Sequence, residues 1–169
     1  IANGGYKIKP KIIVNDDPLT LQDAKNFMEL QSLQKPNTRL FNDSKNIKIV
    51  QEAMFSSTNE QFGTSYRSRI DDPKYQFAGK TGTAQVKRIS KRERELDLKL
   101  EQIPYKDRDH ALYVAYGPYK NPRYALSIIV EHGGSGSKAA APMAKELFKL
   151  IIDRDELRDK QSNFENINI

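Results

Sequence analysis

The segment from Ala78 to Val86 combines a lysine, two threonines and a glycine in an order suited to binding an anion. Its composition predicts a β-strand, and a strand alternates its faces, so Thr81 and Thr83 share a face with hydroxyls able to bind a carboxylate. Lys80 supplies positive charge for the carboxylate and for proton transfer. Gly82 allows close packing of lysine and backbone, and a strand N–H near Thr83 can donate to an oxyanion. These four residues are the candidate site; the alternative is an ordinary surface strand.

Serine patterns elsewhere in the chain fit short nucleophile motifs, but we reject them. Ser32-Leu33-Gln34-Lys35 and Ser135-Gly136-Ser137-Lys138 fit Ser-x-x-Lys, whereas Ser44-Lys45-Asn46 and Ser57-Thr58-Asn59 fit Ser-x-Asn. Serine, lysine and asparagine are abundant enough that such matches are expected by chance. A Ser-x-x-Lys nucleophile needs a helix that brings both side chains together. Lys35 precedes Pro36, which disfavours the helical region.

Segments spread along the chain resemble the transpeptidase domain of penicillin-binding proteins. The Lys80-Thr81-Gly82 triplet is a signature of these enzymes and of class A β-lactamases. The other matching segments follow in the family's order: Ile1 to Gly5, Asp109 to Tyr116, Asn121 to Ser127, Val130 to Gly134, and Ala139 to Pro142. The resemblance is closest to class B, monofunctional enzymes of the elongation type, and it is weak over residues 15–45, 88–108 and the tail.

This resemblance implies an acyl-serine mechanism. A serine attacks the D-Ala-D-Ala bond of a peptidoglycan stem peptide and expels D-alanine, and an amine from a neighbouring stem then resolves the acyl-enzyme into a crosslink. β-Lactams mimic the substrate and leave a slowly hydrolysed acyl group. By motif, Lys80, Thr81 and Thr83 bind and polarise the substrate, and the Thr83 N–H forms half of the oxyanion hole.

The resemblance also implies what surrounds the chain. The nucleophile motif and the Ser-x-Asn motif are expected upstream of Ile1, so the chain is expected to be an inactive C-terminal fragment when isolated. Full-length relatives act in the bacterial periplasm and are anchored in the inner membrane by an N-terminal helix. Expected partners are stem peptides, β-lactams and a glycosyltransferase; no cofactor is expected. A non-catalytic β-lactam-sensing domain and a serine β-lactamase of the same fold remain alternatives.

Charge and the histidines add little to this interpretation. The net charge is +6 and there is no cysteine, which excludes disulfides and thiolate chemistry. Basic residues are interleaved with acidic ones and no nucleic-acid-binding motif occurs, so nucleic acid is disfavoured as a partner. His110 and His132 are expected to cap strand ends rather than bind metal or act in a triad.

The elements that position the candidate site predict an α+β fold, an antiparallel meander with a long C-terminal helix packed on it. Strands are expected at 77–86, 111–116 and 124–130, with a short edge strand at 7–14 and a short helix within 21–30. Residues 87–109 are highly charged and predict a solvated connection. Asp43 or Ser44 is expected to cap a helix that precedes Gly63.

The final helix is expected from about Ala139 to Arg154, within a transpeptidase portion spanning 1–155 and followed by a polar, frayed tail at 156–169. One apolar face is predicted to pack on the sheet, namely Ala140, Met143, Ala144, Leu147, Phe148 and Ile151. One helix cannot cover both faces of the sheet, so self-association through strand edges or swapped elements is expected.

Overall fold

The computed structural model describes residues 1–7, 40, 43–88, 95–96 and 98–167, with side chains up to Leu157. The chain forms two compact units, Ile1–Val50 and Gln51–Ile169, and the second unit carries the sheet. Residues 8–14 of the strand predicted at 7–14, the helix within 21–30 and the rejected Ser32–Lys35 pattern lie outside the described residues.

The described part of the first unit is a tight turn followed by the start of a helix. Gly4 and Gly5 adopt positive φ angles of 79° and 90°, which favour glycine. The side chain of Asn3 accepts hydrogen bonds from the backbone N–H groups of Gly5 and Tyr6, both at 3.2 Å. Helix α2 (Ser44–Asn59) begins next to Asp43, whose Oδ1 accepts a 2.8 Å hydrogen bond from the Lys45 N–H, so the predicted cap is confirmed.

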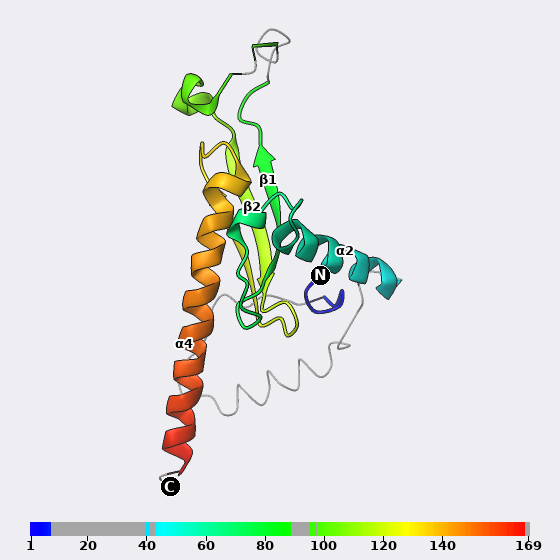
Figure 1. Cartoon of the computed structure of the whole chain (residues 1–169), viewed down its shortest axis with the longest axis vertical. Helices are drawn as coiled ribbons and strands as arrows, with labels where there is room; N and C mark the ends of the chain where they lie inside the picture. Colours follow the sequence, from blue (N-terminus) through cyan, green and yellow to red (C-terminus); the bar gives the residue numbers. More distant parts are fainter. Residues whose placement is uncertain (8–39, 41–42, 89–94, 97, 168–169) are drawn as a thin grey trace, which may run out of the picture. The chain divides into compact units, whose positions relative to one another are not determined.

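The second unit is built on an antiparallel meander in the order β1-β2-β3 (Figure 1). The strands are β1 (Ala78–Ala84), β2 (His110–Gly117) and β3 (Tyr124–Val130), close to the predicted ranges. Thr81 pairs with Tyr113, and Tyr113 pairs with Ile128. Paired residues lie on the same face of a sheet and successive residues of a strand alternate between faces. Tyr113 therefore lies on one face and Val114 on the other.

The face that carries Tyr113 is covered by a helical layer. A π-helical turn, η5 (Gly136–Ala140), leads into the long helix α4 (Ala141–Ile167), which lies along the sheet and continues past its end (Figure 1). Phe148 of α4 stacks on Phe77 with ring centroids 4.9 Å apart, and both rings are fully buried. The α+β fold predicted from the sequence is thus confirmed.

The predicted packing face of α4 is partly wrong. Ala144 and Phe148 are buried as expected, but Met143 and Leu147 are 51% and 39% exposed, and Ile152 and Asp155 are buried instead. The cause is that α4 carries apolar residues on two separate faces, and periodicity alone does not show which one meets the sheet. The helix also continues beyond Arg154, to Ile167; the boundary drawn at 155 stays a prediction.

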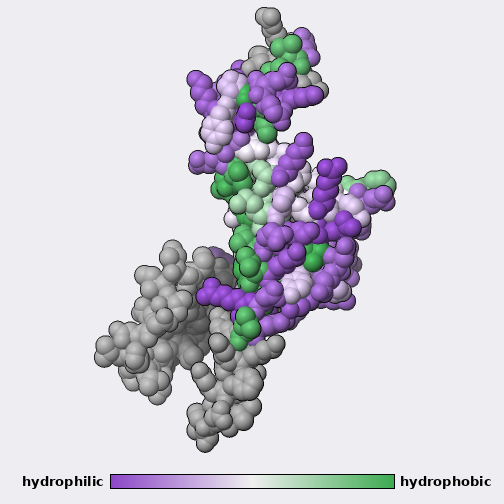
Figure 2. Space-filling view, turned by 60° about the vertical axis from the view of Figure 1, so that its left-hand side comes forward, coloured by the Kyte–Doolittle hydropathy of each residue, from purple (hydrophilic) through white to green (hydrophobic). Residues whose placement is uncertain are grey.

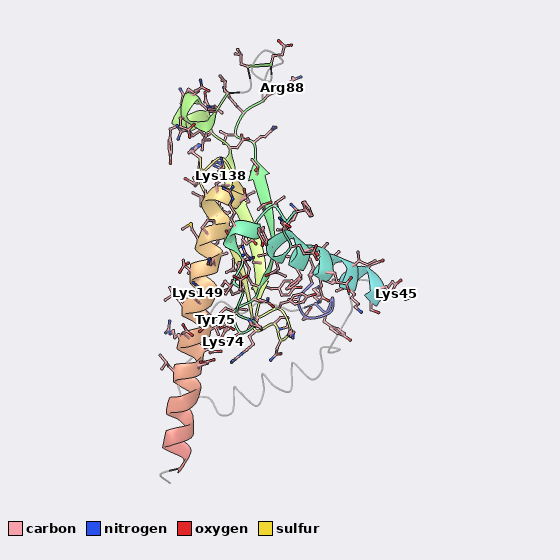
Figure 3. All side chains as sticks on the ribbon, in the orientation of Figure 1. Lys45, Lys74, Tyr75, Arg88, Lys138 and Lys149 are labelled. Atoms are coloured by element: carbon pink, nitrogen blue, oxygen red, sulfur yellow. The ribbon has the colours of Figure 1, made fainter. Side chains whose placement is uncertain are left out.

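Two polar contacts, here called clasps, join α4 to the segments that lead into β1 and β3. Lys74 and Tyr75 lie beside the helix (Figure 3), and both bond to Asp153, Lys74 at 3.2 Å and the Tyr75 hydroxyl at 2.5 Å. Arg123, just before β3, pairs with the buried carboxylate of Asp155 at 2.6 Å.

The connection between β1 and β2 contains two 3-10 turns, η3 (Leu100–Gln102) and η4 (Tyr105–Asp107). Hydrophilic residues predominate where this connection lies, at the top of Figure 2, in agreement with the predicted solvated connection. Part of it, residues 89–94 and 97, lies outside the description. Among the described residues, no helix is both long enough and apolar enough to cross a membrane.

Candidate functional site

Strand β1 carries the four candidate residues along one edge of the described sheet. Lys80 and Thr83 are exposed, whereas Thr81 and Gly82 are half-buried. Lys80 pairs with Val114 in the register, so it lies on the open face, and its ammonium donates a 2.8 Å hydrogen bond to the Thr81 carbonyl. Thr81 and Thr83 lie on the opposite face, as alternation predicts. The four residues share a strand, but the lysine and the two hydroxyls point to different faces.

Thr81 belongs to a line of hydroxyl groups that the sequence did not reveal. Its Oγ1 lies 3.2 Å from the Thr64 hydroxyl, which in turn lies 3.2 Å from the Ser57 hydroxyl at the end of α2. Each hydroxyl can donate to one neighbour and accept from another, so the line can reorient as a unit. No periodicity links Thr64 to a strand 17 residues later, so only the tertiary fold identifies it.

A buried hydroxyl cluster lies beneath β1. The hydroxyl of Tyr113, a fully buried residue, lies 3.0 Å from Thr58 Oγ1 and 3.1 Å from Ser65 Oγ. Ser65 also donates to the Ser57 carbonyl at 3.0 Å. Burial raises the pKa of Tyr113, and the hydrogen bonds with Ser65 and Thr58 partly offset this. The phenol therefore stays protonated and joins the end of α2 to the middle of β2.

Gly79 makes this arrangement possible. A Cβ atom at Gly79 would overlap the Tyr113 hydroxyl and lie 2.8 Å from its Cε1. Nearby, a Cβ on Gly82 would lie 3.2 Å from the Leu112 Cβ, and one on Gly136 would lie 2.7 Å from the Gly82 carbonyl oxygen. Gly82, the glycine of the triplet, therefore leaves room for β2 and for the turn before α4. From the sequence, this room was expected to be used by the lysine side chain.

The rejected Ser-x-Asn pattern at Ser57-Thr58-Asn59 has structural contacts throughout. Asn59 donates from Nδ2 to the carbonyls of Phe55 and Phe77, at 3.0 and 2.9 Å. Ser57 and Thr58 belong to the hydroxyl groups described above. This segment therefore anchors the end of α2 to the start of the sheet.

The two histidines bond at the strand ends, where the sequence placed them. The His132 N–H donates to His110 Nδ1 at 2.9 Å, and His132 Nδ1 lies 3.0 Å from the Arg108 carbonyl oxygen. His132 has a positive φ of 55° in the turn that follows β3. The rings are held edge to face with centroids 4.8 Å apart.

Comparison with known proteins identifies the class to which this fold and strand belong. The family described as the penicillin-binding protein transpeptidase domain matches residues 1–149, and the chain belongs to this family. Peptidoglycan D,D-transpeptidase MrdA of Salmonella typhimurium (strain SL1344) is 31% identical over 153 residues, covering 90% of this chain and 23% of that protein. The chain thus spans less than a quarter of the length of this relative.

Two solved penicillin-binding proteins share the fold. Pseudomonas aeruginosa PBP2, solved in complex with WCK 5153, aligns with a TM-score of 0.57 and 27% identity over 88% of this chain and 27% of that one. Helicobacter pylori PBP2, solved in complex with MreC, aligns with a TM-score of 0.52 and 32% identity over 69% of this chain and 20% of that one. The expected resemblance to elongation-type class B proteins is confirmed.

Proposed function

We propose that this chain forms the Lys-Thr-Gly-Thr strand of a peptidoglycan D,D-transpeptidase that works through an acyl-serine intermediate and is inhibited by β-lactams. The observation that carries the proposal is β1, an edge strand of the described sheet that presents Lys80, Thr81 and Thr83 together with its backbone. An extended peptide binds such an edge by adding a further strand. A stem peptide ending in D-Ala-D-Ala is a ligand of this kind.

The proposed roles follow from exposure and chemistry. Lys80 and Thr83 are exposed and available to a ligand, Lys80 as a cation for the terminal carboxylate and Thr83 as a hydroxyl. The Thr83 N–H is proposed as one donor of the oxyanion hole, where a fixed dipole stabilises the charge that develops in the transition state. Thr81 Oγ1 lies 3.2 Å from the Thr64 hydroxyl, and this contact is proposed to keep Thr81 beside the end of α2.

The attacking serine and its general base are proposed to lie elsewhere in a longer enzyme, so this chain alone is proposed to be inactive. The full-length protein is proposed to work at the periplasmic side of the bacterial inner membrane, held there by an N-terminal helix. H. pylori PBP2 has been solved with MreC; we propose that the full-length protein likewise joins other cell-wall proteins, among them a glycosyltransferase.

The test is a pair of lysine substitutions in the full-length enzyme. Lys80→Ala is expected to slow acylation by a fluorescent penicillin by about 10²–10³-fold, because a group facing developing charge is lost. Lys87→Ala removes the same charge from a residue paired with Asp107 in the connection, at 3.2 Å, and is expected to change the rate little. Equal losses for both variants would remove Lys80 from the mechanism.

A further inference from the structure

The hydroxyl groups of Ser57, Thr64 and Thr81 form a line, here called the hydroxyl line. The Ser57 and Thr64 oxygens are 3.2 Å apart, and so are the Thr64 and Thr81 oxygens. Each hydroxyl carries one proton and can also accept a hydrogen bond, so the line can be ordered in either direction. The protons point either from Ser57 toward Thr81 or from Thr81 toward Ser57. What Thr81 can offer a ligand therefore depends on the two hydroxyls behind it.

Thr64, the middle member of the hydroxyl line, is held in place by its neighbours in the chain. Ser65 donates to the Ser57 carbonyl from both its backbone N–H and its hydroxyl, each at 3.0 Å. On the other side of Thr64, Gly63 lies against the last turns of α2, where an added Cβ would lie 2.5 Å from the Ser56 carbonyl oxygen. The backbone of Thr64 is thereby fixed to the end of α2, so its hydroxyl is a fixed point against which Thr81 can be oriented.

A bound anion would set the direction of the hydroxyl line. Under the proposed function, the carboxylate of a stem peptide or a β-lactam lies at β1, and an ionised carboxylate accepts hydrogen bonds but has no proton to donate. Thr81 can bind it only by donating its single proton. Thr81 must then accept a hydrogen bond from Thr64, and Thr64 must accept one from Ser57. Hydrogen bonds ordered in one direction polarise one another, which strengthens the last bond of the chain.

We propose that Thr64 is a positioning residue of the transpeptidase site. With Ser57 behind it, Thr64 keeps the proton of the Thr81 hydroxyl directed at the carboxylate of the ligand. This inference rests on the proposed function, because it requires an anionic ligand at β1. Thr64 acts through Thr81, so its removal weakens recognition of the carboxylate and leaves the acylation chemistry itself in place.

The test compares two ligands of the full-length enzyme, a fluorescent penicillin with its free carboxylate and the uncharged methyl ester of the same compound. Thr64→Val keeps the branched shape of the side chain and removes the hydroxyl. It is expected to slow acylation by the acid about tenfold, as the loss of one hydrogen bond does, and to slow acylation by the ester less than about twofold. Thr64→Ser keeps the hydroxyl and is expected to recover most of the lost rate. Equal slowing with both ligands would show that Thr64 only supports the fold and would overturn the proposal.

A double substitution tests whether Thr64 acts through Thr81. Thr81→Val removes the hydroxyl that is proposed to meet the ligand. Adding Thr64→Val to Thr81→Val is expected to cause no further slowing with the acid, because the hydroxyl line no longer reaches the carboxylate and residues that act as a unit are not additive. Two effects that simply multiply would mean that Thr64 acts independently of Thr81, contrary to the proposal.

Ser56→Ala is the matched control, since Ser56 lies at the same end of α2 but its hydroxyl donates to the Glu60 carboxylate at 2.9 Å. Its acylation rate with either ligand is expected to match the wild type. The thermal unfolding midpoint of Thr64→Val is expected to stay unchanged, because Thr64 is exposed. A rate loss in Ser56→Ala equal to that in Thr64→Val would indicate a general disturbance of α2 and overturn the proposal.

The same measurements separate this inference from the proposed function. A wild-type full-length protein that the free acid does not acylate would overturn the proposed function, and the inference with it. A wild-type protein that is acylated, with Thr64→Val reacting at the same rate as the wild type with both ligands, would overturn the inference alone.

Discussion

At the scale of single residues, the candidate site depends on one glycine outside the recognised triplet. Gly79 precedes Lys80, and its missing side chain leaves room for the Tyr113 phenol. The phenol reaches Thr58 and Ser65, and Ser65 in turn bonds the carbonyl of Ser57, whose hydroxyl belongs to the line that ends at Thr81. The position of β1 is therefore coupled to α2 through Gly79.

Gly79→Ala is expected to destabilise the chain by roughly 1–3 kcal/mol, the usual cost of overpacking a core site. Its new methyl group would overlap a ring that cannot retreat, because Tyr113 is fully buried. Gly82→Ala is the comparison, since its Cβ would meet Leu112 at the milder distance of 3.2 Å. Urea unfolding of both variants checks the order; a Gly79→Ala chain as stable as the wild type would contradict the proposed close packing.

Two buried tyrosines of β2 give opposite expectations for the same substitution. The Tyr113 hydroxyl has two hydrogen-bonding neighbours, whereas the Tyr116 hydroxyl has none among the described residues. Burial raises the pKa of Tyr116 to about 12, so it too stays neutral. Tyr113→Phe is expected to cost about 1 kcal/mol of unfolding free energy, because hydrogen bonds are lost.

Tyr116→Phe is expected to be neutral or stabilising, because it removes a desolvated hydroxyl that gains nothing in return. Chemical denaturation of the two variants side by side measures the difference. A larger loss for Tyr116→Phe than for Tyr113→Phe would show that the two hydroxyls have been assigned the wrong roles.

At the scale of elements, the limits of the strands could be predicted from the sequence, whereas the face of α4 that packs on the sheet could not. Gly117-Pro118 and Gly133-Gly134 end the apolar runs of β2 and β3, so their limits could be predicted from turn-forming residues. Helix α4 has two apolar faces, and choosing between them requires knowing what Phe77 and the sheet present. The contact between Thr64 and Thr81 could not be predicted from the sequence either, because it joins two segments that share no sequence pattern.

One clasp joins α4 to the segment before β1. Its contribution to stability is expected to depend on pH, because it includes Asp153. Hydrogen bonds from Tyr75 and from Lys74 hold the pKa of Asp153 below its usual value. A carboxyl group whose pKa is lowered by folding contributes stability that is present above its unfolded pKa, about 4. That contribution is lost as the pH falls through the lowered pKa that Asp153 has in the folded chain.

Asp153→Asn is therefore expected to lower stability at pH 6 and to lose this deficit near pH 2. Glu146→Gln serves as the control, because Glu146 lies on the same helix and makes only a 3.9 Å contact with Lys149. Denaturation midpoints at several pH values between 2 and 7 check the result. A constant difference between wild type and Asp153→Asn across this range would exclude the charged clasp.

At the scale of the whole molecule, the chain is proposed to supply one strand of a catalytic site and to lack the group that reacts. Incubation with a fluorescent penicillin is expected to give no covalent adduct, because acylation needs an activated serine. A stoichiometric labelled band, mapped by mass spectrometry to Ser57 or any other serine here, would overturn this part of the proposed function. The full-length enzyme is the positive control.

The two connections of the meander differ greatly in length: residues 85–109 join β1 to β2, whereas residues 118–123 join β2 to β3. Loop-closure entropy grows only logarithmically with length, so a fourfold longer connection costs about 1.2 kcal/mol more to close. That is comparable with burying one or two methylene groups. Insertions and deletions between β1 and β2 are therefore cheap, so the length of this segment can change while the pairing of Lys80 with Val114 is kept.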